Sequence, residues 1–293
     1  MSDSPVLVCI GNLTIDEAVS ASGQHVESVG GDALFAALAA RLAGADSVVV
    51  APLGNDASAA LLSAIRSTGT DPATLPRRER PTVRNIVRYD ELGGRTWDLV
   101  LGEPHFDELS VHPSDLTESA LAAPGILVSG MALPAQLRLA AWLPAHTSAV
   151  IFFDPQEDYI VGNEAAVCDA VRECDVFLPS EVEATALAGT SDLGAAAQFL
   201  LDLGPHTVVI KRAEAGCLVA TREAAPVQLA AEVVDPVDST GAGDSFCGAF
   251  AAQYLMSADA LAAARAGMAA ARIAVSANGI DALLAAVAGE AVR

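Results

Sequence analysis

The chain has 293 residues, 52% of them hydrophobic, which is enough for one large domain with a continuous core. With 16 basic against 37 acidic residues the formal net charge is -21, and because such a surface repels phosphates no nucleic-acid partner is expected. Charged residues interrupt the Ala-rich stretch 246–275, which excludes a membrane span there.

The cysteine pattern indicates a reducing environment. The chain has five cysteines, an odd number, and their spacings do not suit a metal site. The amino-terminal residues, which include Asp3, hold no basic stretch of the kind that opens a secretory signal. We therefore expect a cytoplasmic protein.

Buried strands and helices alternate along most of the chain. The first apolar run, 6–10, predicts a strand, and helical periodicity predicts helices over 32–42 and 56–65. Further apolar runs predict buried strands at 48–50, 126–128, 149–153, 175–178 and 207–210. Continuous apolar strands separated by helices predict an α/β fold with a mostly parallel sheet covered on both faces.

Two segments depart from this alternation. Residues 14–28 and 82–101 alternate apolar and polar side chains, and each contains a glycine turn. Such alternation is typical of half-buried antiparallel strands. We predict two small β excursions, 12–29 and 80–102, from a single domain that spans 1–293.

Arginines gather on the second excursion. Six of the 15 arginines fall between Arg77 and Arg95, and Arg84 and Arg88 share one face of a predicted strand. Planar guanidinium groups in such a cluster would suit a carboxylated or phosphorylated ligand. A solvated surface in an acidic protein explains the cluster as well, and we favour that interpretation.

The most informative segment is 238–250, Asp-Ser-Thr-Gly-Ala-Gly-Asp-Ser-Phe-Cys-Gly-Ala-Phe. The small residues Gly241, Ala242 and Gly243 leave backbone N–H groups open at the start of a helix, where they make a nest for an anion. Asp244 follows in the first helical turn, where the helix dipole favours its ionised form. A phosphate cradle beside a base is what phosphoryl transfer to an alcohol requires.

This segment also admits other interpretations. A lone Gly-x-Gly-Asp is more often a turn with a capping aspartate. A P-loop is excluded because no Gly-x4-Gly-Lys-Ser/Thr occurs, and a dinucleotide fingerprint would need glycine where Phe246 stands.

Over 238–246 the chain resembles the ribokinase-like (PfkB) carbohydrate kinase family, whose signature Asp-Thr-Thr-Gly-Ala-Gly-Asp-x-Phe differs here only at Ser239. The resemblance implies a ribokinase-like three-layer α/β/α sandwich, with 12–29 and 80–102 as a β-lid over a sugar site. It implies that Asp244 is the catalytic base and that the amides of residues 241–243 hold the transferring phosphate. It also places Asp238 and Thr240 beside a monovalent-cation site.

A second set of residues matches the sugar side of the family pattern. The run Gly-Asn-Leu-Thr-Ile-Asp over 11–16 resembles the segment whose Asp binds sugar hydroxyls, so Asn12 and Asp16 are candidate substrate ligands. Gly30 and Gly31 match the amino-terminal Gly-Gly signature. Phe35 stands where the family usually has a sugar-binding Asn, and it either stacks on substrate or turns into the core.

A third set matches the nucleotide side. The family's Pro-Asn-x-x-Glu stretch, whose Glu helps to organise Mg2+ and phosphate, appears here with Ser180 and Glu183. Taken alone, Glu183 is better explained as a helix-start glutamate. The run 209–216 resembles the nucleotide-binding strand and turn, and it contains Lys211, Gly216 and Ala213, the last where Gly is common.

The sequence thus predicts an ATP-dependent kinase that phosphorylates a hydroxyl of a sugar or sugar-like substrate. ATP, Mg2+ and K+ are the implied cofactors, and a homodimer through the lid is an expectation from the resemblance. Two alternatives stay open: a nucleoside kinase of the same fold, and a catalytically silent regulator that binds a sugar or nucleotide. The intact Asp244 motif argues against a catalytically silent protein, whereas Phe35 and Ser180, which depart from the family pattern, argue for one.

Overall fold

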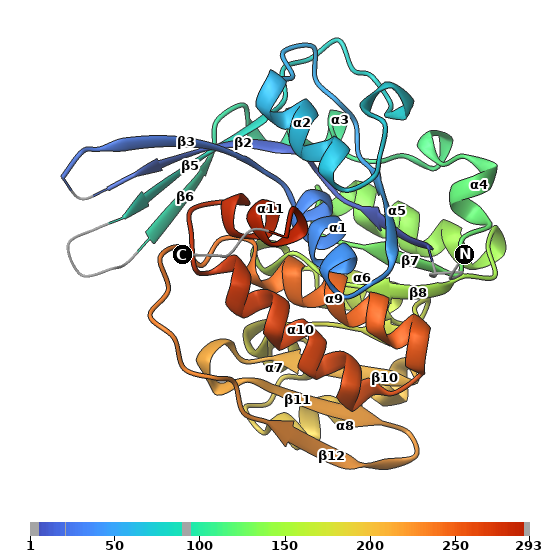
Figure 1. The fold of residues 1–293 in the computed structure, drawn as a ribbon. Helices are drawn as coiled ribbons and strands as arrows, with labels where there is room; N and C mark the ends of the chain where they lie inside the picture. Colours follow the sequence, from blue (N-terminus) through green and yellow to red (C-terminus); the bar gives the residue numbers. More distant parts are fainter. Residues whose placement is uncertain (1–5, 21, 90–94, 290–293) are drawn as a thin grey trace.

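An eight-stranded sheet runs through the middle of the molecule in this computed structural model, which describes residues 6–20, 22–89 and 95–289 (Figure 1). Asp3 lies outside the described residues. The strand order is β12-β11-β10-β9-β8-β7-β1-β4. In chain order the strands are β1 (Val6–Ile10), β4 (Asp46–Val50), β7 (Gly125–Val128), β8 (Val150–Phe153), β9 (Val176–Phe177), β10 (Thr207–Lys211), β11 (Cys217–Thr221) and β12 (Ala224–Leu229).

From β4 to β10 in this order the strands pair with one another in parallel, as the continuous apolar runs predict. At the other edge β11 and β12 are antiparallel. This pair extends the sheet beyond β10 and is not among the predicted strands.

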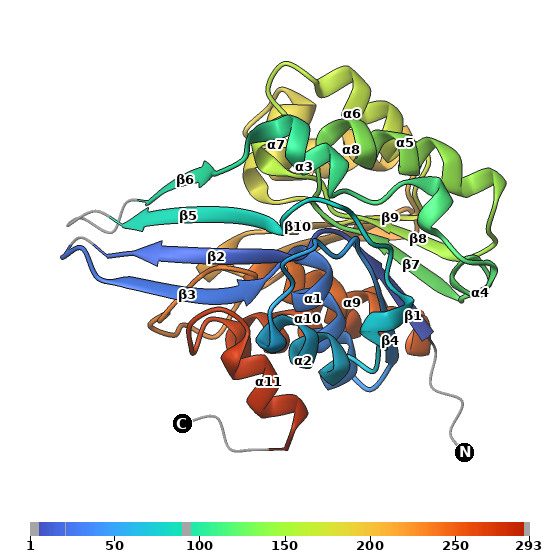
Figure 2. The ribbon, with the colours of Figure 1, turned by 90° about the horizontal axis from the view of Figure 1, so that it is seen from above.

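Helices cover both faces of the sheet (Figure 2). One layer contains α1 (Asp32–Leu42), α2 (Ala59–Ser67), α9 (Ala242–Ser257), α10 (Ala260–Ala274) and α11 (Asp281–Val287). The other contains α5 (Leu133–Trp142), α6 (Glu164–Val171), α7 (Glu181–Ala188) and α8 (Leu193–Leu203). Alternate residues of one strand enter different cores: Cys9 packs with α1 and α9, whereas Ile10 packs with α5. The predicted three-layer α/β/α arrangement is confirmed.

A smaller second sheet projects from one side of the molecule (Figures 1 and 2). Its order is β3-β2-β5-β6, and its strands are β2 (Thr14–Val19), β3 (His25–Gly30), β5 (Val83–Tyr89) and β6 (Arg95–Leu99). Strands β2, β5 and β6 lie inside the excursions 12–29 and 80–102, and β3 extends one residue beyond the first. The parallel pairing of β2 with β5 sets Asp16 opposite Asn85. Closure of this sheet over a substrate stays a prediction.

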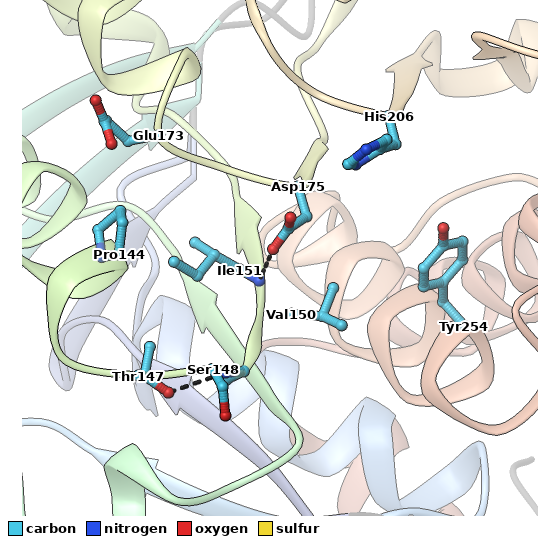
Figure 3. A pocket seen from close by; sticks show the side chains of 10 residues that line it. Pro144, Thr147, Ser148, Val150, Ile151, Glu173, Asp175, His206 and Tyr254 are labelled. Carbon is cyan, nitrogen blue, oxygen red and sulfur yellow. Dashed lines mark hydrogen bonds between the residues drawn. The ribbon is translucent and has the colours of Figure 1, made fainter.

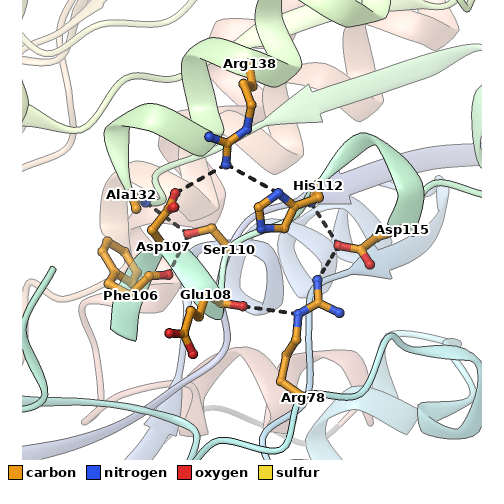
Figure 4. A network of polar contacts seen from close by, with 9 residues as sticks. All are labelled: Arg78, Phe106, Asp107, Glu108, Ser110, His112, Asp115, Ala132 and Arg138. Atoms are coloured by element: carbon orange, nitrogen blue, oxygen red, sulfur yellow. Dashed lines mark hydrogen bonds and ion pairs between the residues drawn. The ribbon is translucent and has the colours of Figure 1, made fainter. Parts of the chain in front are cut away.

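A polar network fixes the segment that returns from the second sheet (Figure 4). Arg78 pairs with Asp115 at 2.6 Å, and Arg138 on α5 contacts Asp107 of α3 (Gly102–Glu108) and His112 at 3.4 and 3.3 Å. The short helix α4 (Glu118–Leu121) follows. No helix among the described residues is long and apolar enough to cross a membrane.

Candidate active site

The signature residues meet at one edge of the main sheet. Asp154 directly follows β8, Lys211 ends β10, and Gly11 follows β1. These strands are parallel, so their carboxyl ends lie on the same edge, where open α/β sheets bind ligands. Asp32 and Asp244 lie in the first turns of α1 and α9, which begin at this edge.

Residues 241–243 form the start of α9. Gly241 precedes the helix with φ 72 and ψ 5, a left-handed conformation that glycine adopts without strain. Gly243 is exposed, and the first N–H groups of a helix have no acceptor within it. The geometry therefore offers donors and a positive helix end to an anion.

Asp244 lies beside this anion nest in a cluster of acidic groups. Its half-buried carboxyl is within hydrogen-bonding distance of the Asp32 carboxyl. Burial and the negative charge of Asp154 raise the pKa of Asp244 to about 6, while the bond to Asp32 and the charge of Lys211 oppose this rise. Near neutral pH the carboxyl is therefore ionised and still basic enough to take a proton.

Lys211, the only lysine in the chain, brings a positive charge to the nest. Its Nζ lies 2.5 Å from Asp154 Oδ1 and 3.4 Å from Cys247 Sγ, and a Cβ placed on Gly243 would be 3.7 Å away. Burial acts to lower the pKa of Lys211, but Asp154 and the other neighbours raise it well above its usual value. The ammonium group therefore stays charged beside the anion nest.

Asp16 is held by its own neighbours on the inner face of the second sheet. Its carboxylate accepts hydrogen bonds from Thr14 Oγ1 at 2.7 Å and Asn85 Nδ2 at 2.8 Å. Burial raises its pKa, and the two hydrogen bonds act in the opposite direction. The carboxylate is thereby fixed in direction, as a ligand for substrate hydroxyls must be.

Neighbouring atoms of the protein leave no room for a side chain at the two glycines before α1. A Cβ at Gly30 would lie 2.8 Å from Asp16 Oδ2, and Gly31, with φ 109, leaves no space beside the Asn12 carbonyl. The Asn12 side chain accepts a hydrogen bond from the Asp32 amide at 3.3 Å. Asn12, Gly30 and Gly31 thus fix the start of α1, and their contact with substrate stays a prediction.

Phe35 is buried, with 1% of its surface exposed. A Cβ at Gly241 would overlap its ring, and a Cβ at Gly30 would lie 3.2 Å from it. The ring therefore packs beneath both signature segments. This position favours the core interpretation of Phe35 over stacking on a substrate.

Arg84 is not brought to the site. Asp16 and Asn85 share one face of the second sheet, and Arg84, the neighbour of Asn85, points to the other face. There it pairs with Asp56 at 3.0 Å and approaches Glu27 at 3.9 Å. The candidate role of Arg84 in substrate binding is therefore not supported by its position.

We expect Arg84→Ala to change kcat and KM by less than about twofold, because Arg84 points away from the face that carries Asp16. Its exposed ion pair stabilises the fold by only about 0.2–1 kcal/mol. Steady-state kinetics with the best acceptor measures this. Arg88→Ala, on the same face and paired with Asp98 at 3.4 Å, is the matched control. A large rise in the KM for the acceptor in Arg84→Ala, but not in Arg88→Ala, would show that Arg84 takes part in acceptor binding.

Ser180 and Glu183 form a capping box at the start of α7. Ser180 Oγ accepts from the Glu183 amide at 3.2 Å, and Glu183 Oε2 accepts from the Ser180 amide at 2.5 Å. Burial raises the pKa of Glu183 to about 7 against the opposing charge of Lys211. The helix-start interpretation of Glu183 thus accounts for one of its oxygens.

Within the described residues, no group of three or more His, Cys, Asp and Glu side chains could hold a metal ion. Mg2+ usually keeps several waters and binds through one or two carboxylates plus substrate phosphates. The buried Glu183 near Lys211 fits a magnesium ion that arrives on a nucleotide. A dedicated protein cage for the metal does not fit this arrangement.

The predicted nucleotide-binding turn connects β10 to β11. Ala213 is exposed and has φ 46, a conformation that explains why glycine suits this position. Gly216, with φ 90, leaves no room for a side chain beside the Leu229 carbonyl. This turn follows Lys211 directly, so a nucleotide bound along it would reach the anion nest.

Asp238 links the loop that leads to the anion nest with the loop around Gly279. Its carboxylate accepts from the amides of Thr240 at 2.9 Å and Gly279 at 3.0 Å. The structure thus gives Asp238 a role in ordering the loop that ends at Gly241. Its part in a cation site, together with Thr240, stays a prediction.

Sequence reasoning missed four residues of the site: Asp32, Asn85, Asp154 and Cys247. Cys247 donates to Asp154 Oδ2 at 3.2 Å. Asp154 could have been found, because it directly follows the predicted strand 149–153 at the ligand-binding edge of the sheet. No local signal marks Asn85, which meets Asp16 only through the pairing of distant strands.

A separate hollow of about 410 Å³ lies at the opposite edge of the sheet (Figure 3). Its walls include Val150 at the start of β8, Asp175 before β9 and His206 before β10. Because the signature residues lie at the carboxyl ends of the same strands, this hollow is not the candidate active site.

Comparison with known proteins agrees with this geometry. A family model described as pfkB family carbohydrate kinase matches residues 6–285. The chain is 30% identical over 253 residues to a cytidine kinase of Thermococcus kodakarensis, covering 85% of this chain and 88% of that one.

Solved structures show the same fold. An adenosine kinase of Sinorhizobium meliloti matches with a TM-score of 0.81 and 20% identity, covering 98% of this chain and 99% of that one. An E. coli protein solved with ATP and Mg2+ matches with a TM-score of 0.80 and 20% identity, covering 98% of both chains.

Proposed function

Since this chain belongs to the pfkB family of carbohydrate kinases and is a phosphotransferase with an alcohol acceptor, we propose that it transfers a phosphoryl group from ATP to a hydroxyl of an uncharged sugar or nucleoside, with Asp244 as the base. The observation that carries this proposal is the position of Asp244 directly after the exposed Gly243, in the first turn of α9. A cytoplasmic location and a homodimer through the second sheet stay predictions.

Each residue of the site has a separate role in the proposed reaction. When bound, ATP supplies the phosphoryl group, and Mg2+ neutralises charge on its phosphates. Asp244 accepts the proton of the acceptor hydroxyl as that oxygen attacks. The amides of residues 241–243 and the ammonium group of Lys211 stabilise negative charge on the phosphoryl oxygens. Asp16, held by Thr14 and Asn85, orients the acceptor through its other hydroxyls.

Of the two acceptor classes in this proposal, a nucleoside is supported by a relative. The relative with 30% identity over 85% of this chain is a cytidine kinase. Among the described residues placed at the site, carboxylates predominate, and the one lysine is paired with Asp154. Both a neutral pentose and a nucleoside suit such a site, whereas a sugar acid does not.

An acceptor panel tests the proposal. ATP turnover would be measured with ribose, 2-deoxyribose, cytidine, adenosine and gluconate, and each product would be identified by mass. We expect phosphorylation of at least one neutral pentose or nucleoside and none of gluconate. A protein that binds these compounds without turnover would instead be the silent regulator.

Potassium is expected to raise turnover well above that in sodium or choline buffer. The resemblance places a monovalent ion beside Asp238 and Thr240, where it would order the loop that ends at Gly241. Initial rates at fixed ionic strength, with only the cation changed, measure this effect. Equal rates in all three salts would contradict a cation site in this chain.

A further inference from the structure

Helices α1 and α9 bring two carboxyl groups face to face. A Cβ at Gly248 would collide with the Ala36 carbonyl, and one at Gly241 would overlap the Phe35 ring, so the two helices approach closely along their first turns. Both helices begin at the edge of the sheet that holds the site. Asp32 and Asp244 lie in these first turns, and a hydrogen bond between their side chains acts on the pKa of both.

The segments that follow two strands, β1 and β7, hold Asp32 in place. Its amide donates to Asn12 Oδ1, and a Cβ at Gly11 would touch its Cβ at 3.3 Å. A Cβ at Gly130, after β7, would lie 3.1 Å from Asp32 Oδ1 and 2.5 Å from Gln156 Oε1. One carboxyl oxygen of Asp32 therefore lies against the end of β7, at the edge of the sheet where α9 begins.

We propose that Asp32 is a positioning residue for the base: the two carboxyl groups share one proton, and Asp32 donates it in a hydrogen bond that holds the ionised Asp244 toward the acceptor. This inference rests on the proposed function, because it assumes that Asp244 is the base.

The charges around the pair explain which carboxyl holds the proton. Asp154 is a third acid nearby, and Lys211, the cation at the site, is paired with it, while the buried thiol of Cys247 donates to Asp154. Two carboxylates in contact repel each other strongly when half-buried. Burial and the charge of Asp244 raise the pKa of Asp32 well above its usual range, whereas Asp32 acts to lower that of Asp244.

The proton balance of the reaction is then simple. The acceptor oxygen forms a bond to the γ-phosphorus as the bond to the β-phosphate oxygen breaks, and ADP leaves. The hydroxyl proton moves to Asp244 and afterwards to solvent. The proton on Asp32 stays in place, so this residue acts only through Asp244.

Two variants of Asp32 test the proposal. Asp32→Ala removes the hydrogen bond, so kcat should fall roughly 10- to 100-fold, as expected for a misplaced catalytic group. Because the bond favours the ionised base, its loss should also move the acid limb of kcat/KM to higher pH. Asp32→Asn keeps an N–H donor and should restore most of the activity and the original limb. Asp281→Asn, the exposed first residue of α11, is the matched control and should change neither.

Carboxyl 13C NMR of the free protein tests the shared proton without any turnover. We expect Asp32 to titrate well above the normal range of aspartate, and its transition to fall to lower pH in Asp244→Asn. An Asp32 that titrates near pH 4 would overturn the proposal. So would an unshifted acid limb in Asp32→Ala, or an Asp32→Asn variant as inactive as Asp32→Ala. Wild-type protein that phosphorylates no acceptor would instead contradict the proposed function, and the titration would still decide the pairing.

Discussion

Replacement of Asp244 by Asn is expected to lower kcat by about 10²–10⁴-fold, the usual contribution of a general base, with ATP affinity nearly unchanged. The amide has the shape of the carboxylate but cannot accept the hydroxyl proton. The amides of residues 241–243 remain, so the phosphate contacts are kept. Single-turnover phosphorylation of the best acceptor and calorimetric titration of ATP measure the two quantities separately.

The control for this variant is another aspartate at a helix start. Asp259 caps α10 through the amides of Leu261 and Ala262, and Asp259→Asn keeps a capping oxygen. It should retain full activity. If Asp244→Asn turns over near the wild-type rate, the assigned mechanism is wrong.

The same mechanism sets the pH dependence of the wild type. Burial and Asp154 raise the pKa of Asp244 to about 6, and only the ionised carboxylate is a base. We therefore expect kcat/KM to fall as the pH drops below about 6, and this acid limb is the one that Asp32→Ala should move.

Local patterns predicted most of the main sheet. Helix α1 begins and ends as its periodicity indicated, at Asp32 and Leu42. Helix α2 begins at Ala59 and not at Asp56, because Ser58 caps it and the Asp56 carboxylate is bound to the Thr82 amide at 2.6 Å. That second contact comes from Thr82, just before β5 and 26 residues away, which no local pattern records.

The candidate site also contains residues that local sequence predicts and residues that only distant contacts bring together. Asp244 and the glycines before it are adjacent in the chain, so the anion nest could be predicted. Asp154 meets Lys211 across 57 residues, and Cys247 meets Asp154 across 93. Asp32 was visible beside the two glycines, but only the close packing of α1 on α9 shows that it faces the base.

Replacement of Phe35 by Asn is expected to lower the free energy of unfolding by about 3–5 kcal/mol, as truncation of a buried aromatic ring does. The ring is 1% exposed and fills the space beneath Gly241 and Gly30. An amide group in its place would be buried without a hydrogen-bond partner. Denaturant unfolding measures this loss. Phe199→Asn, a phenylalanine on α8 that is 39% exposed, is the matched control and should cost far less.

The same variant decides between the two roles of Phe35. The Phe35 ring packs against Gly241, so Phe35→Asn removes a contact that holds the anion nest in place. Turnover should therefore fall on every acceptor alike. The order of preference among ribose, 2-deoxyribose and the nucleosides should stay the same. An unchanged unfolding midpoint together with a changed order of preference would show that the ring contacts the substrate, which would contradict the packing of Phe35 between α1 and the start of α9.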